Sequence, residues 1–358
     1  MSVDFTGNQE IVEAARRNLD QGAWDYVSGA AESETTMRRN RLAFDRIAFR
    51  PRVLLDVTSI DTSTTFLGHK LRIPVLLAPI GSLQVFHPDA AAASARACAE
   101  FGTVPVISSV TEPSLEETAA STGAPKIFQL YVHGDWDWIE AILTRVKAAG
   151  YEALCLTVDT ALYSRRERDI LSRWTPPTQR RGTDPKWRAS VTWELMDRIK
   201  EFTGLPFLVK GIATAEDAAL AVDHGVDVIW VSNHGGRQLD HGRGTMDMMP
   251  EITRAVAGRA VIMLDGGVLR GSDVVKAVAM GARALAVGKL HGWSLAAGVK
   301  DWIVRLLEIL EAEVRATLGL LGVTSFERLT PAHVCPDQAV TLPHEMSSYV
   351  NLLEGRIS

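Results

Sequence analysis

A histidine and an arginine follow an apolar run, within the segment from Val231 to Asp240. Histidine is the side chain whose ordinary pKa lies nearest neutrality, so His234 could accept a proton and later return it. Arg237, three positions later, carries a planar fork of donors that suits a carboxylate. The two glycines between them would let a flat ligand approach the backbone. A base and a carboxylate-binding group at a strand end predict chemistry at the carbon next to a carboxylate.

The same segment, Val-Ser-Asn-His-Gly-Gly-Arg-Gln-Leu-Asp, resembles the signature of the FMN-dependent α-hydroxy acid oxidases and dehydrogenases, a family that includes glycolate oxidase, lactate oxidase and mandelate dehydrogenase. The resemblance extends over roughly residues 20–330. It implies a (β/α)8 TIM barrel, FMN as the cofactor, and oxidation of an (S)-2-hydroxy acid to the 2-oxo acid. It also implies oxygen or another electron acceptor as the second partner, and a homotetramer.

Composition and charge argue against several function classes. Lysine and arginine number 38 and aspartate and glutamate 43, so the net charge is −5 and no nucleic-acid surface is indicated. Cys98, Cys155 and Cys335 are widely spaced, which favours core residues in a reducing compartment and no metal site. No apolar run reaches the ~18 residues of a membrane span, and residues 1–10 lack a basic signal-peptide region. We expect a cytoplasmic enzyme without a membrane contact.

Eight short apolar runs, separated by segments with helical periodicity, predict the fold. Strands that alternate with helices favour a parallel sheet, and continuous apolar runs fit strands buried on both faces. Eight such units close into a (β/α)8 barrel. The runs are Val75–Ala78, Val104–Ile107, Lys126–Leu130, Leu154–Val158, Phe207–Val209, Val228–Val231, Val261–Leu264 and Ala284–Val287. We expect one domain, residues 1–358, with a barrel core at about 71–325 and an N-terminal helical extension from residues 1–70.

Polar residues or glycines follow every one of these runs. In a barrel of this kind the active site is built at the carboxyl-terminal ends of the strands, so these residues should gather at one mouth. They are Pro79-Ile80-Gly81, Ser108, Gln129 with Tyr131, Thr157 with Asp159, Lys210, Ser232 with His234, Asp265-Gly266-Gly267 and Gly288-Lys289.

The last two strands predict a phosphate site, because glycine turns, a helix amino terminus and a cation occur together there. Alone, this pattern indicates only a phosphorylated ligand. The family resemblance implies that Asp265 binds the ribityl chain of FMN, that Gly266, Gly267, Gly288 and Lys289 hold its phosphate, and that Arg270 is a nearby cation. It places Pro79, Ile80, Gly81, Ser108, Gln129 and Thr157 along the isoalloxazine ring, and Lys210 with Ser232 near the N1–O2 edge. A fixed lysine there would stabilise the negative charge that reduction leaves.

On the substrate side, His234 is our candidate base. Asp159 would orient His234 and stabilise the imidazolium. Arg237 and Arg166 would bind the substrate carboxylate, and Tyr131 would form a hydrogen bond to the substrate.

Several positions depart from the family pattern. Trp24 stands where the family usually has a substrate-binding tyrosine, and indole cannot accept a hydrogen bond. Gly81 and Val110 are small, which opens space beside the α-carbon and favours an aromatic or long aliphatic substrate, unless Trp24 refills the same volume. Leu269 replaces a usual arginine and Lys289 replaces another, so FMN binding should be weaker than is typical.

Other readings stay open. The chain could be another FMN barrel enzyme, of the isomerase type, or a catalytically weak flavin-binding paralogue.

Residues 174–190, rich in proline, arginine and threonine, predict a mobile loop over the mouth of the barrel. This loop is basic and polar, which favours an enzyme that is not anchored in a membrane. The tail from His333 onward has no assigned role.

Overall fold

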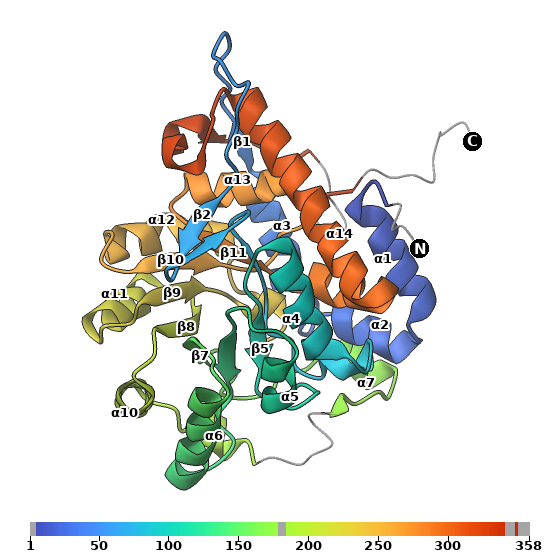
Figure 1. The fold of residues 1–358 in the computed structure, drawn as a ribbon, viewed down its shortest axis with the longest axis vertical. Helices are drawn as coiled ribbons and strands as arrows, with labels where there is room; N and C mark the ends of the chain where they lie inside the picture. The colour runs from blue at the N-terminus through green and yellow to red at the C-terminus, as the bar shows by residue number, and fades with distance from the viewer. Residues whose placement is uncertain (1–4, 178–183, 341–347, 350–358) are drawn as a thin grey trace.

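The computed structural model describes residues 5–177, 184–340 and 348–349, and its centre is a barrel of eight parallel strands (Figure 1). The hydrogen-bonded order is β4-β11-β10-β9-β8-β7-β6-β5, and a parallel bridge between Leu77 and Pro105 joins the two end strands. Each strand overlaps one predicted apolar run, so the predicted (β/α)8 barrel is confirmed. The strands are β4 (Val75–Leu77), β5 (Val106–Ser108), β6 (Ile127–Leu130), β7 (Ala153–Thr157), β8 (Phe207–Ile212), β9 (Val228–Val231), β10 (Val261–Leu264) and β11 (Ala284–Val287).

One long helix or several shorter ones follow each strand and pack around the barrel. In chain order they are α4 (Ala90–Phe101), α5 (Leu115–Ala120), α6 (Trp136–Ala148), α10 (Trp193–Thr203), α11 (Ala215–Asp223), α12 (Thr245–Val256), α13 (Gly271–Ala279) and α14 (Lys289–Leu321). Two short helices, α7 (Glu167–Leu171) and α9 (Lys186–Ala189), lie between β7 and α10. They fall in or beside the predicted loop over the mouth, of which residues 178–183 lie outside the described residues.

The residues before the barrel form the predicted helical extension, with α1 (Asn8–Asn18), α2 (Gln21–Ser28) and α3 (Thr35–Asp45). Helix α1 packs against α14 (Figure 1). Strand β1 (Ile47–Phe49) pairs antiparallel with β12 (Val334–Pro336), so the extension and the end of the described chain are joined. A hairpin of β2 (Thr64–Phe66) and β3 (His69–Leu71) contributes Phe66 and Leu71 to the apolar interior of the barrel.

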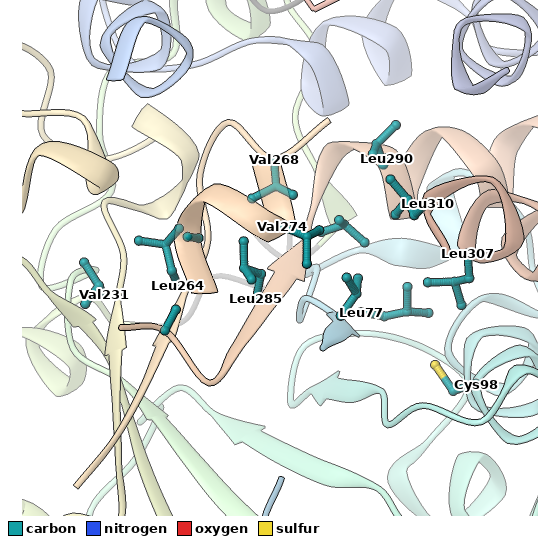
Figure 2. Close-up of a cluster of buried hydrophobic side chains, with 14 of the residues drawn as sticks. Leu77, Cys98, Val231, Leu264, Val268, Val274, Leu285, Leu290, Leu307 and Leu310 are labelled. Carbon is teal, nitrogen blue, oxygen red and sulfur yellow. The ribbon is translucent and has the colours of Figure 1, made fainter. Parts of the chain in front are cut away.

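Alternate residues of each strand face opposite ways, which divides the core in two. One cluster fills the barrel interior and includes Leu76, Cys155 and Trp230. The other lies between strands and helices, and Figure 2 shows part of it, with Leu77 and Leu285 of the barrel near Leu307 of α14. Within the described residues, no helix combines the length and apolarity needed to cross a membrane.

Candidate active site

A cavity of about 270 Å³ opens at the carboxyl-terminal ends of the strands. The barrel period explains how polar groups reach this end of the barrel: on β6, β7 and β8, and directly after β9 and β10, the next inward position beyond the apolar interior carries a polar side chain. We call these five residues the strand-end floor, and they are Gln129, Thr157, Lys210, Ser232 and Asp265. All five are buried, and of the five Lys210 and Asp265 are among the residues that line the cavity.

His234 and Asp159 form the pair that the sequence predicts. His234 Nδ1 lies 2.9 Å from Asp159 Oδ1, and His234 Nε2 lies 3.4 Å from the Tyr131 hydroxyl. Gly211 makes this approach possible, since it has φ +117° beside a register shift and a Cβ there would come within 2.7 Å of Asp159. His234 itself has φ +59°, a conformation that costs free energy in a non-glycine residue and often occurs at functional sites.

The electrostatic surroundings keep His234 neutral and Asp159 charged. Burial lowers the pKa of His234, and the cations Lys210 and Arg166 lower it further against the opposing effect of Asp159. Burial opposes the charge of Asp159, yet His234 and Lys210 hold the pKa of that carboxyl below its ordinary value. A neutral imidazole backed by a carboxylate is suited to accept a proton.

Lys210 is fixed at the bottom of the cavity. Its Nζ lies 3.1 Å from Asp265 Oδ2 and donates to Ser232 Oγ at 2.8 Å, and Ser232 donates in turn to Asp265 at 2.6 Å. Burial opposes its charge, but Asp265 and Asp159 keep the pKa of Lys210 raised. The indole of Trp230, one interior layer deeper, lies 5.4 Å from Lys210 Nζ.

Two members of the floor have unused hydrogen-bonding groups that fit FMN. Among the described residues, neither the buried amide of Gln129 nor the buried hydroxyl of Thr157 has a partner. A buried polar group without a partner costs free energy, so these groups indicate a ligand rich in donors and acceptors. Pro79, Ile80 and Gly81 line the cavity beside them. A flavin ring offers both donors and acceptors, so the residues present fit the cofactor.

The residues at the predicted phosphate end of the site also fit FMN. Gly266 and Gly267 have φ +91° and +83°, and a Cβ on Gly267 would come within 2.9 Å of the Asn40 backbone. Arg41 of α3 donates to the Gly267 carbonyl at 2.6 Å and forms a buried ion pair with Asp273. Lys289 lines the cavity next to Gly288. It also donates to the Ser28 carbonyl at the end of α2.

The structure corrects the predicted role of Arg270 as a cation near FMN. Its side chain pairs with Glu313 at 3.0 Å and is not among the residues that line the cavity. Its place as the N-terminal cap of α13 directs it toward α14 rather than toward the barrel mouth. Leu269 lines the cavity instead. The weaker FMN binding expected from this leucine stays a prediction.

Arg166 and Arg237 lie next to each other at the substrate side of the cavity. Arg166 Nε donates to the Arg237 carbonyl at 3.4 Å, and the Arg237 guanidinium donates to the Gly29 carbonyl at 2.7 Å. Asp169 is buried nearby, where burial raises the pKa of its carboxyl against the effect of the two arginines. Two neighbouring guanidinium groups at the mouth of the cavity can bind a carboxylate.

The structure also corrects the predicted role of Trp24 at the substrate-binding position. Its ring stacks on Trp293 at 6.1 Å, and it is not among the residues that line the cavity. Tyr26, two positions later on α2, takes the expected place: its hydroxyl donates to the Gly81 carbonyl at 2.7 Å, and its ring lies 5.0 Å from the Arg237 guanidinium. Residues two apart on a helix point in different directions, so the tyrosine and the tryptophan cannot share one role. Trp24 therefore does not refill the space beside Gly81.

Of the other predicted residues, Val110 lines the cavity and Ser108 is buried just below it. The sequence reasoning missed several lining residues from outside the strands: Tyr26, Met37, Asn40, Arg41, His133, Tyr163 and Arg188. Tyr26 had a signal, since helical periodicity could have separated its direction from that of Trp24. His133 and Tyr163 follow β6 and β7 in the chain, so the strand-end rule that predicted Tyr131 and Asp159 could have included them. Met37, Asn40, Arg41 and Arg188 had no such signal, because they enter the cavity from helices whose position depends on packing.

Comparisons with known proteins agree with this geometry. The sequence profile of the FMN-dependent dehydrogenase family matches residues 15–336. A peroxisomal (S)-2-hydroxy-acid oxidase of Oryza sativa subsp. japonica is 38% identical over 350 residues, which cover 91% of this chain and 94% of the relative. Glycolate oxidase of Spinacia oleracea is 37% identical over 357 residues, with 94% and 97% covered.

Solved structures give the same result. Mandelate oxidase with (S)-2-phenylpropionate has a TM-score of 0.86 at 35% identity, with 94% of this chain and 100% of that chain covered. A point mutant of an active chimera of (S)-mandelate dehydrogenase has a TM-score of 0.88 at 28% identity, with 93% and 99% covered.

Proposed function

This chain belongs to the FMN-dependent dehydrogenase family, and from that premise we propose that it oxidises an (S)-2-hydroxy acid whose side chain is larger than that of glycolate or lactate. The enzyme is an FMN-dependent oxidoreductase acting on 2-hydroxy acids.

The space beside Gly81 supports the larger substrate. The Ser82 N–H donates to the Val110 carbonyl at 2.9 Å, so Gly81 and Val110 are neighbours in the cavity wall. Neither fills the space between them with a long side chain. An aromatic or long aliphatic substituent on the α-carbon would find room there.

The roles follow from the contacts. Arg166 and Arg237 would bind the carboxylate, and the Tyr131 hydroxyl would hold the substrate oxygen near His234 Nε2. His234 would accept a proton there, while Asp159 fixes the opposite ring nitrogen and stabilises the imidazolium. Bound FMN supplies the acceptor for the hydride equivalent, and Lys210 would stabilise the resulting negative charge.

Anaerobic bleaching of the flavin absorbance tests this function. We expect mandelate or a long-chain 2-hydroxy acid to bleach the flavin faster than glycolate or lactate does. Fastest bleaching by glycolate would overturn the proposed size. His234→Ala should slow bleaching by about 10⁴-fold, whereas His224→Ala, at a surface histidine paired with Asp197, should not change it. An unslowed His234→Ala enzyme would exclude His234 as the base. Readmitted oxygen then distinguishes an oxidase, which recovers its colour quickly, from a dehydrogenase.

A homotetramer is the assembly we propose, formed through an apolar patch of Val53, Leu54, Leu55 and Leu320. These side chains are between 50% and 101% exposed. The patch is continuous because the Arg52 N–H donates to the Leu321 carbonyl, at the end of α14. Exposed apolar surface of this kind favours self-association. Leu54→Asp should convert the assembly to smaller species in light scattering, and an unchanged mass would contradict this interface.

We also propose that the enzyme is located in the cytoplasm. Cys98, Cys155 and Cys335 are free thiols, as proteins of reducing compartments commonly have. Cell fractionation tests it, and recovery with organelles or membranes would contradict it.

A further inference from the structure

Within the described residues, the Arg188 guanidinium has neither an ion pair nor a hydrogen bond, whereas every other lysine or arginine that lines the cavity has at least one of the two. Arg188 lies on α9 with a half-buried side chain that lines the cavity. Its neighbour Lys186, on the same short helix, faces Asp184 at 3.2 Å. A half-buried cation without a counter-charge favours an anionic ligand.

Arg188 lines the cavity together with Tyr131 and His133, and its charge acts to lower the pKa of both side chains. Burial and this nearby arginine lower the pKa of His133 to about 4, so its ring is neutral at neutral pH and can donate one N–H. The His133 ring stacks on Tyr131 at 6.3 Å and on Trp138 at 6.1 Å. This stack fixes the orientation of the imidazole beside the arginine.

The pairing of β5 with β6 brings Val110, which borders the open space beside Gly81, near Tyr131 and His133. Ser108 of β5 pairs with Gln129 of β6, and the Tyr131 N–H donates to Ser109 Oγ at 3.0 Å. Val110 therefore lies beside Tyr131, with His133 following on the same segment. Gly81, Val110, His133 and Arg188 line the same cavity, so a substituent that leaves the α-carbon past Gly81 and Val110 could extend to His133 and Arg188.

The other charges of a bound ligand already have partners. Under the proposed function, Arg166 and Arg237 take the 2-carboxylate, and the phosphate of FMN lies at Gly266, Gly267 and Lys289. Arg188 is left for an additional anion. We propose that Arg188 and His133 bind a second carboxylate at the far end of the substrate side chain, so that the preferred substrates are 2-hydroxy dicarboxylic acids. This proposal rests on the function proposed above and names the chemistry of the distal group.

Matched substrates test the proposal on the holoenzyme. (S)-2-Hydroxyadipate is compared with (S)-2-hydroxyhexanoate, and (S)-4-carboxymandelate with (S)-mandelate, by anaerobic flavin reduction. We expect the diacid of at least one pair to have the higher kcat/KM. A charge-assisted hydrogen bond contributes about 1.5–3 kcal/mol, so Arg188→Leu should lower the diacid-to-monoacid ratio by about 10–100-fold. The monoacid should change by less than about threefold, because it does not contact the distal site.

Two further variants separate a specific contact from a general one. Arg188→Lys should recover part of the ratio, since it keeps the charge and loses the planar fork. Lys186→Leu, at the paired cation on the same helix, should leave the ratio unchanged. Binding of the products gives an independent measurement: 2-oxoadipate should perturb the flavin spectrum at lower concentration than 2-oxohexanoate, and Arg188→Leu should remove this difference.

The outcomes are distinguishable. If monoacids reduce the flavin and the ratio does not respond to Arg188→Leu, the distal anion site is wrong and the proposed function stands. If Arg188→Leu slows both members of a pair equally, the arginine acts on the loop or the fold and the distal site is again wrong. If no 2-hydroxy acid of either kind reduces the flavin, the proposed function itself fails.

Discussion

The strand-end floor and the outer wall of the cavity are built differently. The floor residues sit on paired strands of the barrel, and hydrogen bonds between neighbours fix Lys210, Ser232 and Asp265. The outer wall consists of Tyr26, Asn40, Arg41 and Arg188, which come from α2, α3 and α9 outside the barrel. Side-chain hydrogen bonds and one buried ion pair hold it. We therefore expect electron and proton transfer to depend on the floor and on the His234–Asp159 pair beside it, and cofactor retention and selectivity to depend on the wall.

The largest expected effect concerns Asp159, beside the floor. Asp159→Asn should lower kcat/KM by about 10⁴-fold, because the imidazolium loses its carboxylate. His234 must be deprotonated to act, so wild-type kcat/KM should fall only at pH values below its lowered pKa. Removing Asp159, which raises that pKa, should move this acid limb to still lower pH. A limb that moved upward would contradict the assignment of the base.

Arg41, in the wall, should affect stability more than rate. Arg41→Met removes the counter-charge of the buried Asp273 and leaves it only the backbone N–H groups of Leu269 and Arg270 as donors, which should cost about 3–5 kcal/mol in the free energy of unfolding, measured with urea. In the wild type, Arg41 overcomes the burial of Asp273 and lowers its pKa. That contribution is present above the ordinary pKa of 3.8 and is lost as the pH falls through the folded pKa.

In the Arg41→Met variant the Leu269 N–H and Lys276 are left to oppose the effect of burial, so the Asp273 pKa is higher than in the wild type. The difference in stability between the wild type and the variant should therefore become smaller as the pH falls. The double variant with Asp273→Asn should recover part of the loss. Equal stability of the single variant and the wild type would show that this part of the wall does not depend on the ion pair.

Lys210 is the buried cation of the floor. Lys210→Met should slow flavin reduction by about 10²-fold or more per bound FMN, because the fixed cation at the bottom of the cavity is lost. Lys126→Met is the matched control, since Lys126 is also buried but donates to the Thr122 and Ala124 carbonyls before β6. Similar slowing in both variants would indicate a fold defect rather than a local charge.

The smallest effect separates Tyr26 from Trp24. Tyr26→Phe keeps the ring beneath Arg237 and removes the hydrogen bond to Gly81, so KM should rise by up to about 10-fold. Trp24→Phe, which changes only the stack on Trp293, should alter KM by less than about twofold. A larger effect at Trp24 than at Tyr26 would reverse the correction made from the structure.

The floor was predictable from the sequence and the wall was not. Gln129 and Thr157 lie near the ends of apolar runs and Lys210 directly follows one, and strand alternation decides which way they point. Arg41 and Arg188 carry no such signal, because a helix outside the barrel can be placed only by its tertiary contacts. Arg270 shows the same limit. Sequence adjacency to Leu269 suggested a cofactor contact, while the start of α13 turns its side chain toward Glu313.

The pairing of β1 with β12 has a consequence for how the enzyme acquires its cofactor during synthesis. Strand β1 directly follows α3, which carries Asn40 and Arg41, yet its partner residues 334–336 are translated nearly three hundred residues later. The barrel likewise closes only when β11 has paired with β4. Most of the barrel must therefore be synthesised before the helices of the wall can pack against it. We expect FMN to be captured after translation, by a chain that is already almost fully folded.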